Sequence, residues 1–125
     1  MKTHKDLEVW KKAITLAKSV YALTKDLPRE EIFSLSDQMR RSSVSVASNI
    51  AEGAARQTNK EFIQFLYISL GSASELDTQI EICKAISFKG VNPEDIEAIQ
   101  NELSTISKMV YGLITKVKQN SGTNH

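Results

Sequence analysis

Apolar residues recur every three or four positions through four long segments of this chain, and this spacing constrains the fold more than any other sequence feature. The period matches one face of an α-helix, whereas a half-buried strand would need strict alternation. The two prolines, Pro28 and Pro93, stand at joints between segments. The chain is therefore expected to be all-α, with its helices joined by short turns.

The first segment carries two apolar sets that run side by side. The first set is Val9, Ala13, Leu16, Val20, Leu23 and Leu27, and the second is Leu7, Trp10, Ile14, Ala17 and Tyr21. Together they form a stripe wide enough to contact two neighbouring helices, as in a bundle. Pro28 ends the segment because proline disfavours helical geometry at the residue before it.

The second and third segments meet at a turn near Thr58. The second helix is expected to begin between Ile32 and Ser36 and to run to about Arg56. Its seam contains small residues that permit close helix approach: Met39, Ser43, Val46, Ile50 and Gly53. Thr58-Asn59-Lys60-Glu61 has the pattern of a capping box and starts the third helix, which should end with Gly90 in the left-handed conformation.

The fourth helix has the clearest start, at Asn92-Pro93, where a preferred N-cap residue precedes a proline at the first helical position. Its apolar repeat continues from Ile96 to Val117. Short connections make neighbouring helices antiparallel. The sequence thus predicts a single-domain, up-down-up-down antiparallel four-helix bundle over residues 1–119, followed by a disordered C-terminal tail at 120–125.

Composition excludes several classes of function. The chain has 125 residues, with 16 basic and 15 acidic side chains, so a polycationic monomer is excluded. The single cysteine, Cys83, fits a small buried hydrophobe. Because the only histidines, His4 and His125, lie in terminal segments, we expect no catalytic triad, zinc site or di-iron site.

These absences predict a non-enzymatic protein without a cofactor or metal. The sequence shows no secretory signal pattern and no apolar run of about 20 residues, the length of a membrane span. A cytoplasmic location without membrane contact is therefore expected.

A polar stripe is predicted along the second helix. On a helical wheel one face collects Arg41, Ser45, Ser48, Glu52 and Arg56, with Asn49 at the edge. Glu52 precedes Arg56 by four residues, the favoured order for an intrahelical ion pair. The stripe is either a solvated face or the lining of a subunit contact or central opening.

An ion pair between the second and third helices is a further expectation. If the helices are antiparallel about the turn at 57–58, facing residue numbers total about 115, which places Arg40 opposite Glu75. Arg40 or Arg41 should then pair with Glu75, and Glu75→Ala should lower the melting temperature because an unpaired arginine would remain.

The basic residues are concentrated in the first helix. Residues 1–26 carry six lysines against three acidic residues, for a net charge of +3. Lys5, Lys11 and Lys12 flank Trp10, and Lys18 continues along the helix. This basic strip is either an ordinary solvated face or a phosphate-contacting surface, and cyclic symmetry would strengthen the second interpretation by repeating it.

Six sequence blocks resemble the four-helix-bundle proteins encoded within intervening sequences of bacterial 23S ribosomal RNA genes. The likeness spans about residues 6–90, and the fourth helix agrees only in pattern. Ile32-Phe33 departs from the family, which more often has a tyrosine there. The blocks are Leu7-Glu8-Val9-Trp10, Leu27-Pro28-Arg29-Glu30-Glu31, Leu35-Ser36-Asp37-Gln38-Met39-Arg40-Arg41-Ser42, Ser48-Asn49-Ile50-Ala51-Glu52-Gly53, Phe62-Ile63-Gln64-Phe65-Leu66 and Gly71-Ser72-Ala73-Ser74-Glu75-Leu76.

The resemblance implies a cytoplasmic bacterial bundle that assembles as a ring-shaped homopentamer and is often called a ribosomal protein. The chain is similar also to the accessory variability proteins of diversity-generating retroelements, whose pentameric barrel engages reverse transcriptase and nucleic acid. By this likeness six residues are expected to be structural or subunit-interface positions first and RNA contacts second. They are Arg40, Arg41, Asn49, Glu52, Arg56 and Glu75.

Two functional hypotheses follow from the sequence. The first is a non-enzymatic oligomer that associates with structured RNA or an RNA–protein complex through basic strips repeated by symmetry. The second is a structural or scaffold oligomer that binds a protein partner through its apolar seams and small-residue faces. A hydrolase or nuclease is a minor third interpretation, because metal-ligand clusters and helix-borne histidines are absent from the sequence.

Overall fold

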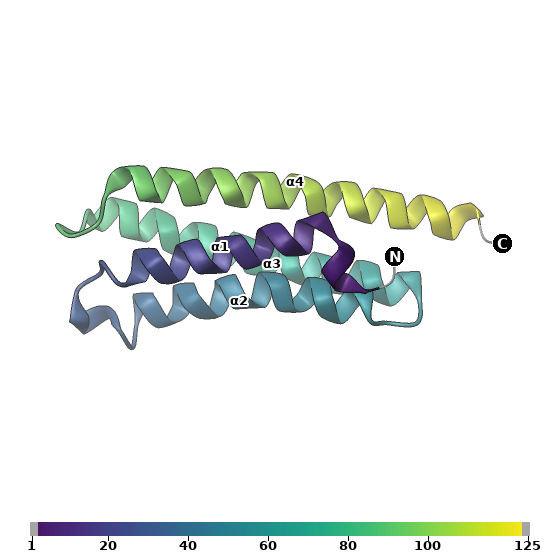
Figure 1. Cartoon of the computed structure of the whole chain (residues 1–125), viewed down its shortest axis with the longest axis horizontal. Coiled ribbons are helices and arrows are strands. Elements are labelled where there is room, and N and C mark those ends of the chain that lie inside the picture. Colours follow the sequence, from purple (N-terminus) through teal and green to yellow (C-terminus); the bar gives the residue numbers. More distant parts are fainter. Residues whose placement is uncertain (1–2, 124–125) are drawn as a thin grey trace.

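The computed structural model describes residues 3–123, which form four α-helices and two short 3-10 helices (Figure 1). The 3-10 helices are η1 (His4–Asp6), before α1, and η2 (Arg29–Glu31), between α1 and α2. The four long helices are α1 (Glu8–Thr24), α2 (Leu35–Ala54), α3 (Asn59–Ile86) and α4 (Pro93–Thr123).

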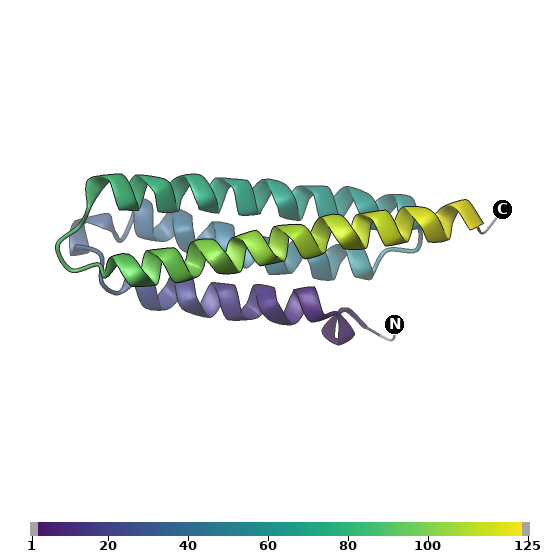
Figure 2. The ribbon, with the colours of Figure 1, turned by 90° about the horizontal axis from the view of Figure 1, so that it is seen from above.

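The four helices form an antiparallel bundle in which each packs beside its neighbour in sequence. α4 closes the bundle by packing against α1 (Figures 1 and 2). α1 and α3 therefore lie on one diagonal of the bundle, and α2 and α4 lie on the other. The predicted all-α, up-down-up-down four-helix architecture is confirmed, and α1 begins at the same end of the bundle at which α4 ends (Figure 1).

The core is built from the predicted apolar seams. All six members of the first apolar set are buried, five in α1 and Leu27 just after its end. All five members of the α2 seam are buried too, including the small residues Ser43 and Gly53. Burial of these side chains supplies the main driving force for folding, because each buried aliphatic side chain contributes about 1.5–3 kcal/mol.

The second apolar set of α1 differs from the prediction. Leu7, Trp10 and Ala17 are half-buried, while Ile14 and Tyr21 are 45% and 41% exposed. This side of α1 borders α2, since Arg40 of α2 lies over the Tyr21 ring. The stripe therefore forms an open apolar shoulder beside α2 and is not covered by a second helix within the subunit.

α2 and α3 approach each other closely through small residues. Ser69 Oγ donates to the Val46 carbonyl at 2.8 Å, and the Ser45 and Ser72 hydroxyls lie 2.7 Å apart. At Gly53, an added Cβ would lie 2.8 Å from Phe65 Cβ. These contacts confirm the predicted antiparallel register, in which facing residue numbers total about 115.

The helix boundaries follow the expected caps except at the end of α3. The Thr58 hydroxyl accepts from the Glu61 amide at 3.2 Å, and Asn92 Oδ1 accepts from the Glu94 amide at 2.9 Å. The prediction for Gly90 was wrong, because the left-handed residue is Ser87, with φ of 58°. A Cβ at Gly90 would lie 2.9 Å from the Asp26 carbonyl, so this glycine serves a close approach between two connections.

Helix α4 continues to Thr123, beyond residue 119, at which the apolar repeat predicts the bundle to end. The last member of that repeat, Val117, is buried. No proline follows it, so the backbone hydrogen bonds of the helix continue beyond the core. Residues 124–125 of the expected tail lie outside the described residues.

The close approach at Gly53 predicts the effect of adding a methyl group. Gly53→Ala should lower the free energy of unfolding by about 1–3 kcal/mol, because Phe65 Cβ and the Phe62 carbonyl are fixed to the α3 backbone and cannot move aside cheaply. Urea denaturation at one protein concentration measures the difference.

Gly112→Ala is the matched control. Nothing lies within 4 Å of the position of its added Cβ, so the helix propensity of alanine should raise stability by up to about 1 kcal/mol. Equal effects of the two substitutions would contradict the packing described for Gly53.

Candidate functional site

The polar stripe of α2 faces outward along most of its length. Arg41, Ser48, Glu52 and Arg56 are exposed, whereas Ser45 and Asn49 are half-buried. Asn49 Nδ2 donates to the Ser45 carbonyl at 2.9 Å and lies 3.0 Å from Ser45 Oγ, which in turn contacts Ser72 of α3. The inner edge of the stripe therefore fastens α2 to α3, and its outer edge is open within the subunit.

Two of the stripe's arginines are paired with acids of their own helix. Arg56 Nη2 lies 3.0 Å from Glu52 Oε2, which confirms the predicted intrahelical pair, and Arg41 Nε lies 3.0 Å from Asp37 Oδ2. The Arg56 guanidinium also lies 4.6 Å from the centre of the Phe65 ring. Exposed ion pairs of this kind contribute about 1 kcal/mol or less, so both arginines can exchange partners readily.

Arg40 has a different environment from its neighbour Arg41. Its side chain crosses to α1, where Nε donates to Thr24 Oγ1 at 2.8 Å and the guanidinium lies 4.9 Å from the centre of the Tyr21 ring. Within residues 3–123 its charge has no carboxylate partner in an ion pair. Arg40 is therefore a half-buried positive charge that bridges α2 and α1.

These side chains surround a shallow hollow between α1 and α2, which we call the α1–α2 groove. It has a volume of about 610 Å³. Its lining combines one aromatic ring, one exposed valine, one aspartate, two arginines and two serines. The residues are Tyr21, Asp37, Arg40, Arg41, Val44, Ser45 and Ser48. The apolar shoulder of α1 continues from Tyr21 toward Ile14, one heptad away along the same helix face.

The predicted ion pair with Glu75 is wrong. The residue numbers place Arg40 and Glu75 at one height in the bundle, but Arg40 is directed to α1 and Arg41 is paired with Asp37. Glu75 is exposed on α3, on the face opposite to the core. The expected destabilisation by Glu75→Ala therefore has no basis within the subunit, because helix register fixes height and not the direction in which a side chain points.

The basic strip expected on α1 is divided between two faces. Lys5, Lys11, Lys12 and Lys18 are all exposed, but Lys12 borders α4 while Lys11 and Lys18 point away from the core. Lys25 extends the outward face by a further seven residues. We call Lys11, Lys18 and Lys25 the lysine row, and Lys11 alone among them forms an ion pair in the described chain, with Glu8 at 3.2 Å.

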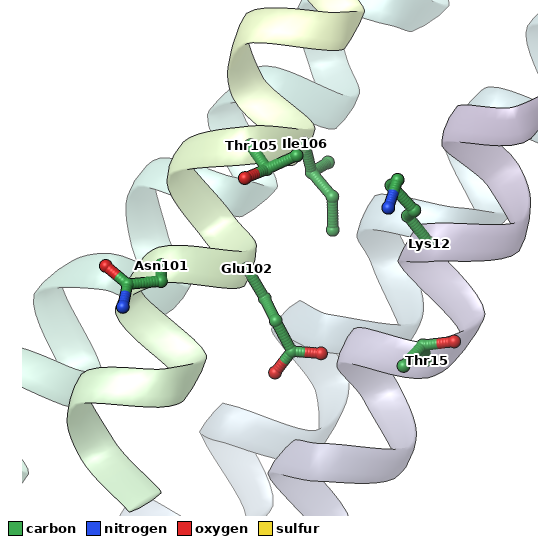
Figure 3. A pocket seen from close by; sticks show the side chains of 6 residues that line it. All are labelled: Lys12, Thr15, Asn101, Glu102, Thr105 and Ile106. Carbon is green, nitrogen blue, oxygen red and sulfur yellow. The ribbon is translucent and has the colours of Figure 1, made fainter. Parts of the chain in front are cut away.

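A cavity of about 290 Å³ lies between α1 and α4 (Figure 3). Glu102 points from α4 toward α1, with Lys12 on the facing helix, and Ser19 Oγ donates to Glu102 Oε1 at 3.3 Å. Burial raises the pKa of the Glu102 carboxyl, while the Ser19 hydrogen bond and the Lys12 charge partly oppose this shift. The other lining residues are Thr15, Asn101, Thr105 and Ile106.

His4 and Cys83, the two described residues with the side-chain types of a base and a nucleophile in a Cys–His pair, both have packing environments. His4 packs against Trp10 with ring centroids 5.0 Å apart, and His125 lies outside the described residues. Cys83 is fully buried, and burial raises the pKa of its thiol, as suits a packed side chain. Among residues 3–123, no group of three or more side chains could hold a metal ion.

None of the described helices contains a stretch that is both long enough and apolar enough to cross a lipid bilayer. Three surfaces of the described residues are considered below: the α1–α2 groove, the lysine row and the outward face of α3.

Fold and surface together define a small helical bundle with a charged groove and an open apolar shoulder. The family model described as 23S rRNA-intervening sequence protein matches residues 5–112, so the chain belongs to that family. The match includes most of α4, beyond the span from 6 to 90 over which the sequence blocks carry the resemblance.

A solved structure agrees with this assignment. A protein of unknown function from the S23 ribosomal protein family of Bacteroides thetaiotaomicron is 31% identical, with a TM-score of 0.75. The similarity covers 85% of this chain and 97% of that protein. Comparison with curated proteins found no match.

The pKa of Glu102 gives a pH prediction with a definite sign. Because the folded-state pKa lies above the unfolded value, folding disfavours the ionised carboxyl, and this cost is absent below the unfolded pKa and complete above the folded pKa. Glu102→Gln removes the charge and keeps an acceptor for Ser19. In thermal melts the variant should exceed the wild type in stability at pH 7.5, by a margin that shrinks on acidification. A margin independent of pH would contradict this description.

Proposed function

We propose that this protein is a non-enzymatic, oligomeric helical bundle that associates with structured RNA or an RNA–protein complex in the bacterial cytoplasm. The lysine row of α1 carries the proposal. Its three lysines recur every seven residues on one exposed face, about 10 Å apart along the helix axis. Lys18 and Lys25 form no ion pair within residues 3–123, so both are available to phosphates.

Rotational symmetry makes a weak basic surface effective. One subunit has a formal net charge of +1, too little for strong binding to a polyanion. In the five-subunit ring that the family resemblance implies, the +3 charge of residues 1–26 is repeated to about +15. Each phosphate contact releases a counterion and so increases the affinity for RNA. A symmetric array of lysines can therefore bind RNA while each subunit stays near neutral.

The geometry of the charged residues favours binding over catalysis. Burial raises the pKa of the Glu102 carboxyl, and the Ser19 hydrogen bond and the Lys12 charge partly oppose this rise. The arginines of α2 are held by Asp37, Thr24 and Glu52, an arrangement that suits a contact surface.

A scaffold oligomer that binds a protein partner is the second candidate. The observation that favours it is the number of large apolar side chains exposed on several elements. Phe33 is 94% exposed, and Ile32 is beside it in the connection before α2. Such side chains are typical of protein contacts, so a partner retained after nuclease treatment would favour this function.

RNA binding by the lysine row is tested with a double variant. Lys18→Ala with Lys25→Ala should weaken binding to a 23S ribosomal RNA fragment and reduce the slope of log K against log salt by about 1 per lysine. Isotherms at 50 and 200 mM salt measure both quantities. The substitutions should leave the fold intact because both side chains are exposed.

Lys84→Ala is the matched control. Lys84 is an exposed lysine on α3, which does not pack against α1, so its loss should leave affinity and salt slope nearly unchanged. Absence of binding by the wild-type oligomer at low salt would overturn the proposed function. Equal effects of the α1 and α3 substitutions would show that net charge, and not the lysine row, governs binding.

A further inference from the structure

The outward face of α3 has no partner in the subunit. α3 packs against α2 and α4, and its remaining side presents Ile68, Gly71, Glu75, Ile82 and Ile86 at helical spacing. The three isoleucines are 51%, 45% and 54% exposed. This row of apolar side chains, which we call the α3 face, is interrupted by Gly71, Glu75 and the exposed Thr78.

Gly71 and Glu75 are unexplained by the packing of a single subunit. A Cβ at Gly71 would meet nothing within 4 Å, although glycine inside a helix costs about 1 kcal/mol relative to alanine. Glu75 lies one turn further along and forms no ion pair among the described residues. The α3 face therefore combines a position without a side chain, Gly71, with a negative charge that has no ion-pair partner among the described residues, Glu75.

The α1–α2 groove has the complementary features. Arg40 is a half-buried positive charge without a carboxylate partner, and Nε is its one nitrogen with a hydrogen bond in the described chain. The exposed Val44 lines the groove with Arg40, and Ile14 continues the apolar shoulder of α1 beyond Tyr21. The exposed Phe33 lies in the connection before α2. The α3 face thus carries Glu75 as an unpaired negative charge. The groove carries Arg40 as an unpaired positive charge, beside Arg41 and Asp37, which pair with each other.

The register within the subunit brings these features to matching heights. Facing residues of α2 and α3 total about 115, so Arg40 has the height of Glu75 and Val44 that of Gly71. Phe33 lies in the turn just before α2, toward the Ile82 end of α3. The contacts of Arg40 with Tyr21 and Thr24 place Ile14 near the height of Ile68. A neighbouring copy that is rotated, and not shifted along the helices, keeps these heights.

We propose that the α3 face of one copy packs into the α1–α2 groove of a second copy, with Glu75 paired to Arg40 across the contact. The inference rests on the oligomer of the proposed function and names the surfaces that build it. In this contact Gly71 of one copy leaves room for the exposed Val44 of the other. Ile68 covers Ile14, and Ile82 covers Phe33. The Glu75 carboxylate supplies acceptors for the free nitrogens of Arg40.

This contact is head-to-tail. The groove lies between α1 and α2, whereas the α3 face lies on another side of the bundle, so each copy uses two different surfaces (Figures 1 and 2). Head-to-tail contacts close into a ring when the rotation axis runs parallel to the helices and the angle permits. The lysine row lies at the rim of the groove, beyond the apolar shoulder, and remains open to RNA.

A charge-reversal series tests the pairing by light scattering after size exclusion. Glu75→Arg should reduce the oligomer to the 13.9 kDa subunit, because two positive charges then meet in the contact. The doubly reversed chain, Glu75→Arg with Arg40→Glu, should recover the oligomer. Asp77→Arg is the matched control, since Asp77 is an exposed acid of the same helix that lines the α3–α4 side, and it should leave the molar mass unchanged.

A second test leaves Arg40 unchanged, because Arg40 also contacts α1 within the subunit. In the double variant Val44→Cys with Gly71→Cys, mild oxidation should link copies into covalent oligomers, whereas neither single variant should form more than trace dimer. Cys83 is fully buried and does not compete.

The outcomes separate the possible failures. An oligomer of wild-type mass in Glu75→Arg, or efficient linkage in either cysteine single variant, would overturn the proposed contact and leave RNA binding by the oligomer standing. A monomeric wild type that still binds RNA would overturn the contact and the symmetric mechanism together. Dissociation by Glu75→Arg, combined with linkage between positions 44 and 71, would support the contact.

Discussion

Close packing between α2 and α3 is the constraint on which the rest of the structure depends. Gly53 leaves no room for a side chain against Phe62 and Phe65, and Ser69 reaches the Val46 carbonyl. Because these contacts tolerate no sliding, they fix the register of the two helices. The register in turn determines the height at which every surface side chain of α2 and α3 is presented.

The surface shows how one subunit can be nearly neutral and still suited to charged partners. Its unpaired charges lie on different surfaces: Arg40 in the α1–α2 groove, Glu75 on the α3 face, and Lys18 and Lys25 of the lysine row on the outward side of α1. Exposed pairs such as Glu52 with Arg56 contribute little to stability. The unpaired charges are therefore the informative ones, because no opposite charge among the described residues pairs with them.

The sequence was sufficient to predict the elements and the core, because burial follows helical periodicity. Every member of the first α1 set is buried, and the α2–α3 register is as expected. The sequence was insufficient where the direction in which a side chain points determines its contacts. Arg40 and Glu75 share a height but point to different sides, and the second α1 set remains partly open because α2 does not cover it.

Two local features also lay beyond pattern reasoning. Tyr21 belongs to an apolar stripe in sequence, yet its ring meets Arg40 because α1 and α2 are antiparallel neighbours. Ser87 takes the left-handed conformation that a glycine would favour. Gly90 lies so close to the Asp26 carbonyl that a Cβ there would clash with it. The seven-residue spacing of Lys11, Lys18 and Lys25 was visible in the sequence and could have identified the lysine row.

The central claim is that the subunit presents two incomplete surfaces that a second copy completes. The molar mass of the wild-type protein, measured by light scattering from about 1 to 100 µM, tests this claim most directly. A closed assembly predicts one mass, a fixed multiple of 13.9 kDa, across that range. A mass of 13.9 kDa throughout, or one that grows steadily with concentration, would contradict it.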